Sequence, residues 1–544
     1  MSGTKREMRT FIARIINSLQ AVLSIFKRTI IDKWTAAFIV HNKKNWKDYE
    51  SATEEEILFE VNSMCSAIIS YSYLANILSK KYNSKINGYV LRKPGRWKQY
   101  LNFAIHKVFK SFNIREIIYL DLTRSQLKER DRLFNKIYPD LKTKKDVEDL
   151  SVEGTLIGDL IYDSHLRKNK VPTINIKGLS FQESLKQSLG IYIYWRDYFN
   201  THHVKAVNVS HCVYTTAIIL RLAIRRNIPA YQINATHAYY LTKKNLWAYD
   251  DFYYFPEEFR KLSHEEQRSG LIEAEKRLEK RFAGDVGVDM NYSKKSAYTK
   301  NSNNKVLSES PQLKIFIAPH CFFDSPHPYG VSLFPDFYEW LTFIGKISEE
   351  TDYDWYIKTH PDFLPGNIPI IEEFINKYPK FTLIPAETSH HQIIEEGIDF
   401  ALTVHGTIGF EYAALGVTVI NASMCNPHIG YNFNIHPKSV EEYERILLDL
   451  PNQKLNIDVN EVYEYYYMKF INNNVENWLF NDYVGFINNI GGYAKQFGTI
   501  SYQKFLEEFS AEKHKWIIHS LNNFIESKNY CMQKKHYSKD FQKI

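Results

Sequence analysis

The chain has 544 residues, a formal net charge of +7, and 44% hydrophobic and 24% charged residues. This length exceeds the size at which one core usually keeps growing, so at least two globular domains are expected. The basic residues are spread along the chain, which argues against a nucleic-acid partner, and no uncharged apolar run reaches the roughly 18 residues of a membrane-spanning helix.

Five cysteines are present, Cys65, Cys212, Cys321, Cys425 and Cys531, and none forms a CxxC pair. Their odd number and spacing argue against a disulfide framework and against a structural zinc site. The sequence therefore fits a reducing cytoplasm best.

Residues 1–50 are expected to form a helical arm. Residues 8–40 mix apolar stretches with basic residues and lack the small-residue cleavage site of a secretory signal. Two interpretations fit this pattern equally well. The helix lies peripherally on an anionic inner membrane, or it packs on the protein's own domain.

An alternation of strands and helices begins at Ile57. Residues 57–61 form a predicted strand, Cys65–Tyr82 has helical periodicity, and residues 85–91 form a second strand. More strands are predicted at Glu116–Leu122, Val204–Ser210 and Ile228–Ile233, between helical stretches that include Phe181–Phe199 and Tyr214–Arg226. This pattern predicts a parallel sheet covered by helices over residues 51–255, the first α/β domain.

A change of composition separates the two halves of the chain. Glu257–Phe282 is a strongly charged helical stretch, and Asn291–Gln312 is polar and nearly free of apolar periodicity. We interpret residues 256–312 as a charged helix followed by an interdomain linker.

A second alternation occupies residues 313–440. Its predicted strands lie in LKIFIAP, DWYIKT and FTLIP, with helices near Phe337–Ser348, Ile368–Tyr378 and His390–Glu396, and it ends in ALTVHGTIGFEYAALGVTVI, a strand, turn, helix and strand. The fold class is therefore α/β, with two doubly wound Rossmann-like domains and a helical region over residues 441–544.

Ligands of open parallel sheets bind beyond the carboxyl ends of the strands. Four loops of the second domain qualify: PHCFFDSPHPY (319–329), KTHPD (358–362), AETSHH (386–391) and HGTIGFE (405–411). In KTHPD, strand alternation places Lys358 and His360 on one face, where a cation and an imidazole would point together toward the ligand. Pro361 would end the strand.

In HGTIGFE, Thr407 stands at the expected N-cap of a helix and Glu411 follows four residues later on the same face. Gly406 and Gly409 permit close approach of the backbone. In the functional interpretation, Thr407 and the adjacent N–H groups bind a phosphate, and Glu411 binds ribose hydroxyls. The structural alternative is an ordinary capped helix.

The combination of Lys358-Thr-His360-Pro361 with His405-Gly-Thr407-Ile-Gly409-Phe-Glu411 resembles the capsule polysaccharide biosynthesis glycosyltransferases, GT-B enzymes that include Kdo transferases. The layout is also similar to GT-B bacterial sialyltransferases. The resemblance covers roughly residues 315–425 and implies a nucleotide-sugar donor, with a CMP-sugar favoured. It also implies that His360 and Thr407 lie at the donor's nucleotide and phosphate, with Glu411 close by. His405 and Gly406 are further candidates for donor binding. Gly406 departs from the family pattern, where a Ser often precedes the Thr.

The first loop carries His320, Asp324, Ser325 and His327 directly after a strand. Imidazolium groups there would neutralise the charge of a leaving phosphate. No second ligand cluster or DxD motif accompanies the loop, so we expect no metal and no cofactor beyond the nucleotide-sugar. Asp324 is a catalytic candidate. The alternative is a structured turn with surface histidines.

Sugar transfer with inversion needs a base for the acceptor hydroxyl, expected from the first domain. Asp163 and His211 are the candidates because each follows an apolar stretch, and Asn62 and Ser63 are candidates for sugar hydroxyls. The sequence thus predicts a metal-independent cytoplasmic glycosyltransferase with a surface polysaccharide or lipid-linked glycan as acceptor. A sugar-nucleotide epimerase, a CDP-polyol phosphotransferase and a non-catalytic scaffold of envelope polysaccharide assembly remain alternatives.

Overall fold

The computed structural model describes residues 31–46, 53–91, 103–248, 251–286, 288–289, 295–298, 304–360, 366–475 and 477–536. Residues 1–30 of the predicted arm and Pro361 lie outside these ranges. Helix α2 (Lys33–Asn45) begins after Asp32, whose carboxylate accepts the backbone N–H groups of Trp34 and Thr35. The helix packs on the protein itself, with Phe38 fully buried and stacked on Tyr502 at 4.3 Å between ring centroids.

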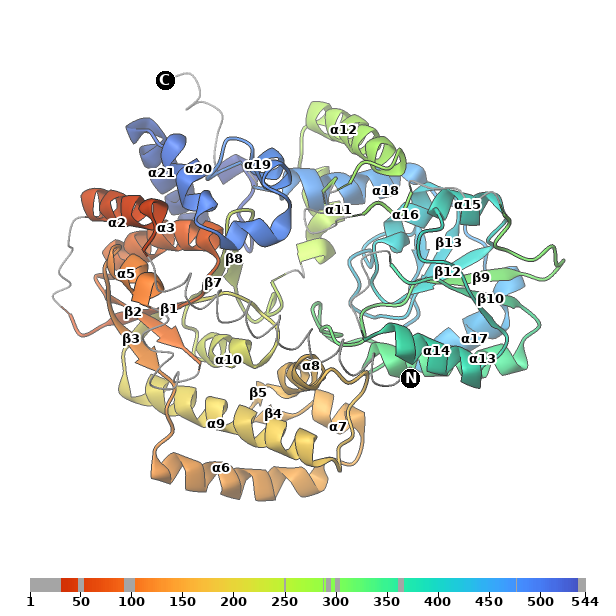
Figure 1. The fold of residues 1–544 in the computed structure, drawn as a ribbon, viewed down its shortest axis with the longest axis horizontal. Coiled ribbons are helices and arrows are strands. Elements are labelled where there is room, and N and C mark those ends of the chain that lie inside the picture. Colours follow the sequence, from red (N-terminus) through yellow and green to blue (C-terminus); the bar gives the residue numbers. More distant parts are fainter. Residues whose placement is uncertain are drawn as a thin grey trace, which may run out of the picture.

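Two six-stranded sheets form the two halves of the molecule (Figure 1). The first has the order β3-β2-β1-β6-β7-β8, with only β8 antiparallel to its neighbour, and consists of β1 (Glu56–Glu60), β2 (Lys85–Val90), β3 (Ile114–Tyr119), β6 (Val204–Val209), β7 (Ala230–Ile233) and β8 (Ala238–Leu241). The second is parallel throughout and has the order β11-β10-β9-β12-β13-β14, with β9 (Lys314–Ile317), β10 (Asp354–Ile357), β11 (Phe381–Leu383), β12 (Phe400–Thr403), β13 (Thr418–Asn421) and β14 (Asn434–Ile435).

The same order, 3-2-1-4-5-6, is present in both sheets when each is counted along the chain. This is the doubly wound order, in which the chain reverses direction beside the first strand and leaves a switch point there. The predicted fold class, GT-B-like with two Rossmann-like domains and a helical C-terminal region, is therefore confirmed. The domain boundaries given above remain a prediction.

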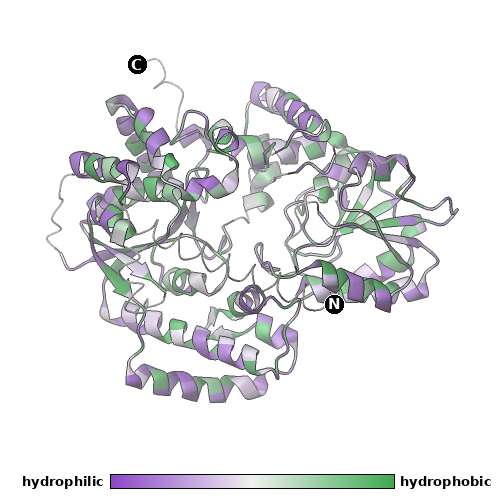
Figure 2. Ribbon diagram, viewed as in Figure 1, coloured by the Kyte–Doolittle hydropathy of each residue, from purple (hydrophilic) through white to green (hydrophobic). Residues whose placement is uncertain are grey.

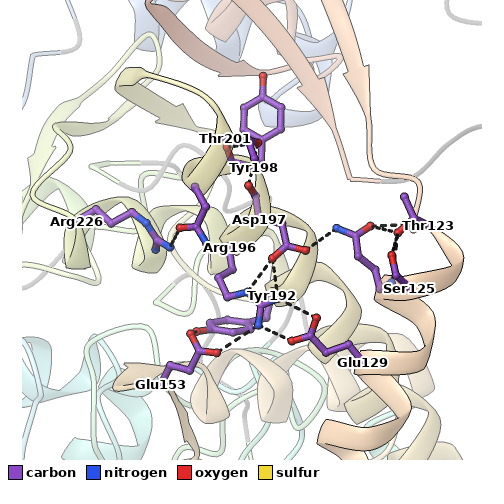
Figure 3. A network of polar contacts seen from close by, with 12 residues as sticks. Thr123, Ser125, Glu129, Glu153, Tyr192, Arg196, Asp197, Tyr198, Thr201 and Arg226 are labelled. Atoms are coloured by element: carbon purple, nitrogen blue, oxygen red, sulfur yellow. Dashed lines mark hydrogen bonds and ion pairs between the residues drawn. The ribbon is translucent and has the colours of Figure 1, made fainter.

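The helices of the first half surround its sheet (Figure 1). They are α3 (Cys65–Tyr82), α5 (Phe103–Lys110), α6 (Arg124–Ile137), α7 (Lys144–Glu148), α8 (Gly158–Asn169), α9 (Leu179–Thr201) and α10 (Ile218–Arg225). A short hairpin of β4 (Ser151–Val152) and β5 (Thr155–Leu156) precedes α8. Arg196 of α9 joins α6 through two bonds to Glu129, at 2.7 and 3.0 Å (Figure 3).

The charged stretch between the halves forms two helices, α11 (Phe255–Arg260) and α12 (His264–Phe282), where one was predicted. The division has a local cause, because Ser263 and Glu266 form a reciprocal capping box that starts α12. Figure 2 shows α12 as largely hydrophilic, in keeping with only three buried positions, Gly270, Ala274 and Leu278. The described part of the predicted linker is not wholly solvated, because Tyr298 and Leu307 are buried.

Helices α13 (Phe337–Glu350), α14 (Ile368–Lys377), α15 (His390–Glu395), α16 (Ile408–Ala414) and α17 (Val440–Leu448) belong to the second half. The chain continues through α18 (Val459–Tyr466), a π-helical segment (Tyr467–Asn472), α19 (Tyr483–Asn489), α20 (Ile500–Glu507) and α21 (Ala511–Ser527). Helices α19, α20 and α21 return to the first sheet and share one hydrophobic core with α3, whereas α18 packs with α12 and α16. Among the described residues, no helix is both long and apolar enough to cross a membrane.

Candidate functional site

His320 and His405 meet at the carboxyl ends of β9 and β12. Their ring centroids are 4.5 Å apart, and the His320 ring also stacks on Phe337 at 4.5 Å. The backbone N–H of His405 donates to Nε2 of His320, so a neutral His320 carries its proton on Nδ1. Burial lowers the pKa of His405 to about 4 and that of His320 well below its usual value. Both rings are therefore neutral donors at pH 7.

Thr403, which sequence reasoning missed, explains why the chain has glycine at position 406. Its hydroxyl accepts the backbone N–H of Gly406 at 3.0 Å and lies 3.2 Å from Nε2 of His320. A Cβ on residue 406 would come within 2.7 Å of this hydroxyl oxygen. The space for the family's Ser is thus occupied by the Thr403 side chain.

Thr407 occupies the predicted N-cap of α16, but its side chain makes no capping hydrogen bond. Thr407 has φ −62° and ψ −22°, so its backbone is helical and lacks the extended conformation that is typical of a capping residue. The hydroxyl remains available to a ligand.

Lys358 and His360 both act on His390: burial lowers the pKa of His390 well below its usual value, and the charges of Lys358 and His360 lower it further. His360 is exposed, whereas Lys358 is 2% exposed and lies 3.5 Å from Nε2 of His390. Burial lowers the pKa of Lys358 to about 8, although the charges of Glu411 and Glu387 partly oppose this shift. Nδ1 of His390 lies 2.6 Å from the hydroxyl of Tyr412, which places Lys358 in a buried polar network beneath α16.

Glu411 faces α12 and the linker. Its Oε1 accepts two bonds from Arg281, at 2.8 and 2.5 Å, and its Oε2 accepts the hydroxyl of Tyr298 at 2.9 Å. Both carboxylate oxygens therefore have protein partners. These contacts do not test the prediction that Glu411 binds ribose hydroxyls.

Gly409 allows α16 to pack against His428, which lies in the loop after β13. A Cβ at position 409 would lie 2.3 Å from Cε1 of His428 and 3.0 Å from Nδ2 of Asn434. His428 is 1% exposed and its ring is held edge-on by Tyr465 at 4.8 Å between centroids. The close backbone approach that Gly409 was expected to permit is thus a contact between α16 and the His428 ring.

We expect Gly409→Ala to destabilise the protein by about 1–3 kcal/mol, because the added methyl group overlaps the His428 ring. Thermal unfolding of the purified variant measures this. The matched control is Gly409→Ala in a His428→Ala background, where the ring is absent and the extra cost of the methyl group should largely disappear. An equal cost in both backgrounds would contradict the packing explanation.

Asp163, predicted as a catalytic base, contacts two residues predicted for the donor. It is 1% exposed, its Oδ2 accepts the hydroxyl of Ser325, and its Oδ1 lies 2.6 Å from Nδ1 of His327. Nε2 of His327 lies 3.3 Å from Glu148. Burial alone would lower the pKa of His327, but the two carboxylates outweigh burial and raise it to about 10. Asp163, His327 and Glu148 form a buried charged cluster that joins the two halves.

A second buried junction lies next to this cluster. Tyr162 and Thr173 donate to Oδ2 of Asp336 at 2.5 and 2.6 Å, and Asp336 also caps α13. The two halves are therefore fixed to each other by two buried, hydrogen-bonded carboxylates, Asp163 and Asp336.

Asp324 is the exposed carboxylate of that loop, with 56% of its side chain exposed. Its Oδ1 accepts a hydrogen bond from the hydroxyl of Tyr214 at 2.7 Å and another from the backbone N–H of Ser325 at 3.0 Å. Arg167 lies 3.8 Å away. Tyr214 has φ +64° and ψ 173°, a strained conformation for a non-glycine residue, which places its hydroxyl across the junction.

His211 follows β6 and lies beside Tyr214, with ring centroids 5.8 Å apart. Its Nδ1 accepts the backbone N–H of Cys212 at 3.1 Å, so the neutral ring carries its proton on Nε2. Burial lowers the pKa of His211, and the charge of Asp324 partly opposes this shift. His211 is therefore a hydrogen-bond donor in this geometry. Asn62 binds the hydroxyl of Tyr71 and the backbone N–H of Met64.

Within the described residues, no group of three or more His, Cys, Asp or Glu side chains has the geometry of a metal site. The chemistry available is that of neutral imidazole donors, a threonine hydroxyl and one exposed carboxylate. Such a set suits an anionic ligand on the side of the second sheet and a hydroxyl group near Asp324.

No protein-family model matches the sequence, and no curated protein matches it. Several solved structures show a loose likeness. UDP-GlcNAc 2-epimerase from Methanocaldococcus jannaschii is 13% identical over 75% of this chain and 97% of its own, with a TM-score of 0.22. The O-GlcNAc transferase of Thermobaculum terrenum is 10% identical over 84% and 69%, with a TM-score of 0.23. MurG of Acinetobacter baumannii is 8% identical over 77% and 95%, with a TM-score of 0.21. The fold assignment rests on the strand order of the two sheets.

Proposed function

We propose that this protein is a glycosyltransferase that moves a sugar from a nucleotide-sugar to a hydroxyl of a surface polysaccharide or lipid-linked glycan. The observation that carries the proposal is the pair of neutral imidazole donors, His320 and His405, at the strand ends of a Rossmann-like sheet, with the exposed carboxylate of Asp324 on the same loop as His320. A CMP-sugar is favoured by the sequence resemblance, and no metal is required by the proposed chemistry.

In this proposal the donor's phosphate accepts hydrogen bonds from His405 and the Thr407 hydroxyl. Asp324 takes the proton of the acceptor hydroxyl, the acceptor oxygen bonds to the anomeric carbon, and the bond from that carbon to the phosphate oxygen breaks with its electron pair staying on the nucleotide. In the same proposal, the neutral Nε2–H of His211 orients a substrate oxygen, which the acceptance of the Cys212 N–H by Nδ1 supports.

Asp324 is preferred to the other two candidate bases for a geometric reason. Both oxygens of Asp163 are occupied inside the buried cluster. The lone pair of the His211 ring accepts a backbone N–H. Oδ1 of Asp324 also has partners, but the side chain is more than half exposed, so its second oxygen is accessible to an acceptor.

Nucleotide binding tests the donor site. The wild-type protein is expected to unfold at a higher temperature with CMP, CDP or UDP, because a ligand that binds the native state stabilises it. His405→Asn is expected to weaken the binding of that nucleotide about 10-fold or more, since one hydrogen bond to a charged group is lost. The exposed His519→Asn is the matched control. No shift with any nucleotide would contradict the proposal and favour a non-catalytic scaffold.

Product analysis separates transfer from the alternatives. Nucleotide release that requires an acceptor supports transfer. Interconversion of stereoisomers of a nucleotide-sugar without an acceptor would instead identify an epimerase, and release of a nucleoside monophosphate from a CDP-polyol would identify a phosphotransferase.

A further inference from the structure

Several buried polar atoms around the first turn of α16 have no hydrogen-bond partner. They are Nε2 of His405, Nδ1 of His428 and both amide atoms of Asn434. His428 is 1% exposed and Asn434 4% exposed. Both lie against the same backbone position, Gly409. Buried polar groups are nearly always satisfied in native proteins, so this concentration indicates a site where a ligand or ordered water supplies the missing partners.

Lys469 brings a cation to this place from a distant part of the sequence. It lies in the π-helical segment that continues α18, four residues after Tyr465, whose ring contacts His428. Residues four apart lie close to one face of such a helix, and π-helical turns are frequent at functional sites. The Lys469 ammonium also lies 5.9 Å from the ring centroid of Phe255.

The charge of Lys469 acts on both halves of the molecule. Burial is the main reason that the pKa of His428 is lowered, and His436, His405 and Lys469 lower it further. Burial likewise lowers the pKa of His237, which follows β7 of the first sheet, to about 3, with His211 and Lys469 adding to this shift. The groups acting on the two rings are cationic or imidazole groups, so this environment favours an anion.

We propose that Lys469 binds the phosphate that leaves with the nucleotide, together with ring N–H groups of His428 and His405. The inference rests on the proposed function and adds a binding residue that lies outside the second sheet and its loops. When the anomeric carbon–oxygen bond breaks, the electron pair remains on the phosphate oxygen, and the ammonium neutralises the charge that accumulates there.

The test compares nucleosides with nucleotides in the full-length protein. Calorimetric titrations use two series of ligands: cytidine, CMP and CDP, and uridine, UMP and UDP. Each ligand is titrated into the wild type, Lys469→Met, Lys469→Arg and Lys261→Met. Lys261 is a surface residue with 57% of its side chain exposed, so Lys261→Met removes the same charge away from the site. We expect Lys469→Met to weaken nucleotide binding at least about 10-fold while leaving nucleoside binding unchanged. Lys469→Arg should keep most of the affinity.

The outcomes separate the inference from the proposed function. Wild-type nucleotide affinity in Lys469→Met overturns the inference alone. An equal loss for nucleoside and nucleotide assigns Lys469 a structural role and also overturns it. Absence of binding by the wild type to every probe overturns the proposed function and the inference with it. Unfolding midpoints of the unliganded variants show whether any of them is misfolded.

Discussion

His327→Gln is expected to lower the free energy of unfolding by roughly 3–5 kcal/mol, which for a chain of this length lowers the thermal unfolding midpoint by about 3–5 °C. His327 is 1% exposed and lies between two buried carboxylates, Asp163 and Glu148. Removing the imidazolium leaves Asp163 buried without a cation and leaves Glu148 with Lys145 alone, which is more costly than losing the cluster as a whole. Scanning calorimetry measures the midpoint.

Two comparisons make this prediction specific. The exposed His519→Gln should leave the midpoint unchanged. Asp163→Asn introduced into the His327→Gln protein should recover part of the loss, because the uncompensated charge of Asp163 is then removed. A His327→Gln midpoint within about 1 °C of the wild type would show that the cluster does not hold the two halves together.

The stabilisation from His327 should also depend on pH in a defined direction. Its pKa is raised from 6.5 to about 10 in the folded protein, so the folded state binds this proton more tightly than the unfolded chain does. The contribution is complete below pH 6.5 and is lost as the pH rises toward 10. The difference between wild type and His327→Gln should therefore shrink over that range, whereas a constant difference would contradict the assignment.

Asp324→Asn is expected to lower kcat for sugar transfer by about 10²–10⁴-fold, the usual contribution of a general base. The amide keeps the size of the side chain and can still accept from Tyr214, but it cannot take the acceptor's proton. The donor KM should change little, because the donor contacts proposed here come from His405 and Thr407. Steady-state kinetics with an identified donor and acceptor measures both constants.

Asp131→Asn is a suitable control because that carboxylate is comparably exposed, at 51% against 56%, and lies on α6 far from the loop along the chain. Asp163→Asn provides a second comparison and should mainly lower stability. A normal kcat in Asp324→Asn combined with a large loss in a stable Asp163→Asn protein would transfer the proposed role to Asp163.

Local sequence patterns were sufficient for much of the fold. Helix α3 has the predicted bounds, Cys65–Tyr82, and residues 401–420 form the predicted strand, turn, helix and strand. These segments have strong periodicity and clear turn residues, which depend only on neighbours in the sequence. The short strands β8 and β14 were not predicted, since a few residues at a sheet edge carry little pattern.

The site was predictable as a set of loops but not as a set of contacts. His320 and His405 were expected at neighbouring strand ends, and they do meet. The pairing of Asp163 with His327 joins residues 164 positions apart, and no local pattern encodes it. Lys469 was missed for the same reason, because the packing of α18 and the π-helical segment on α16 joins distant parts of the sequence.

The last helices affect the first sheet in a way that concerns protein synthesis. Trp478, Phe505 and Leu521 belong to the same buried cluster as Ile57 and Leu74, and the backbone N–H of Met532 donates to the carbonyl of Ala238 on the edge strand β8. The amino-terminal half leaves the ribosome several hundred residues before these partners exist. Its apolar surface on α3 must therefore stay uncovered until translation is almost complete, so this half cannot finish folding first, although domains commonly fold in the order of their synthesis.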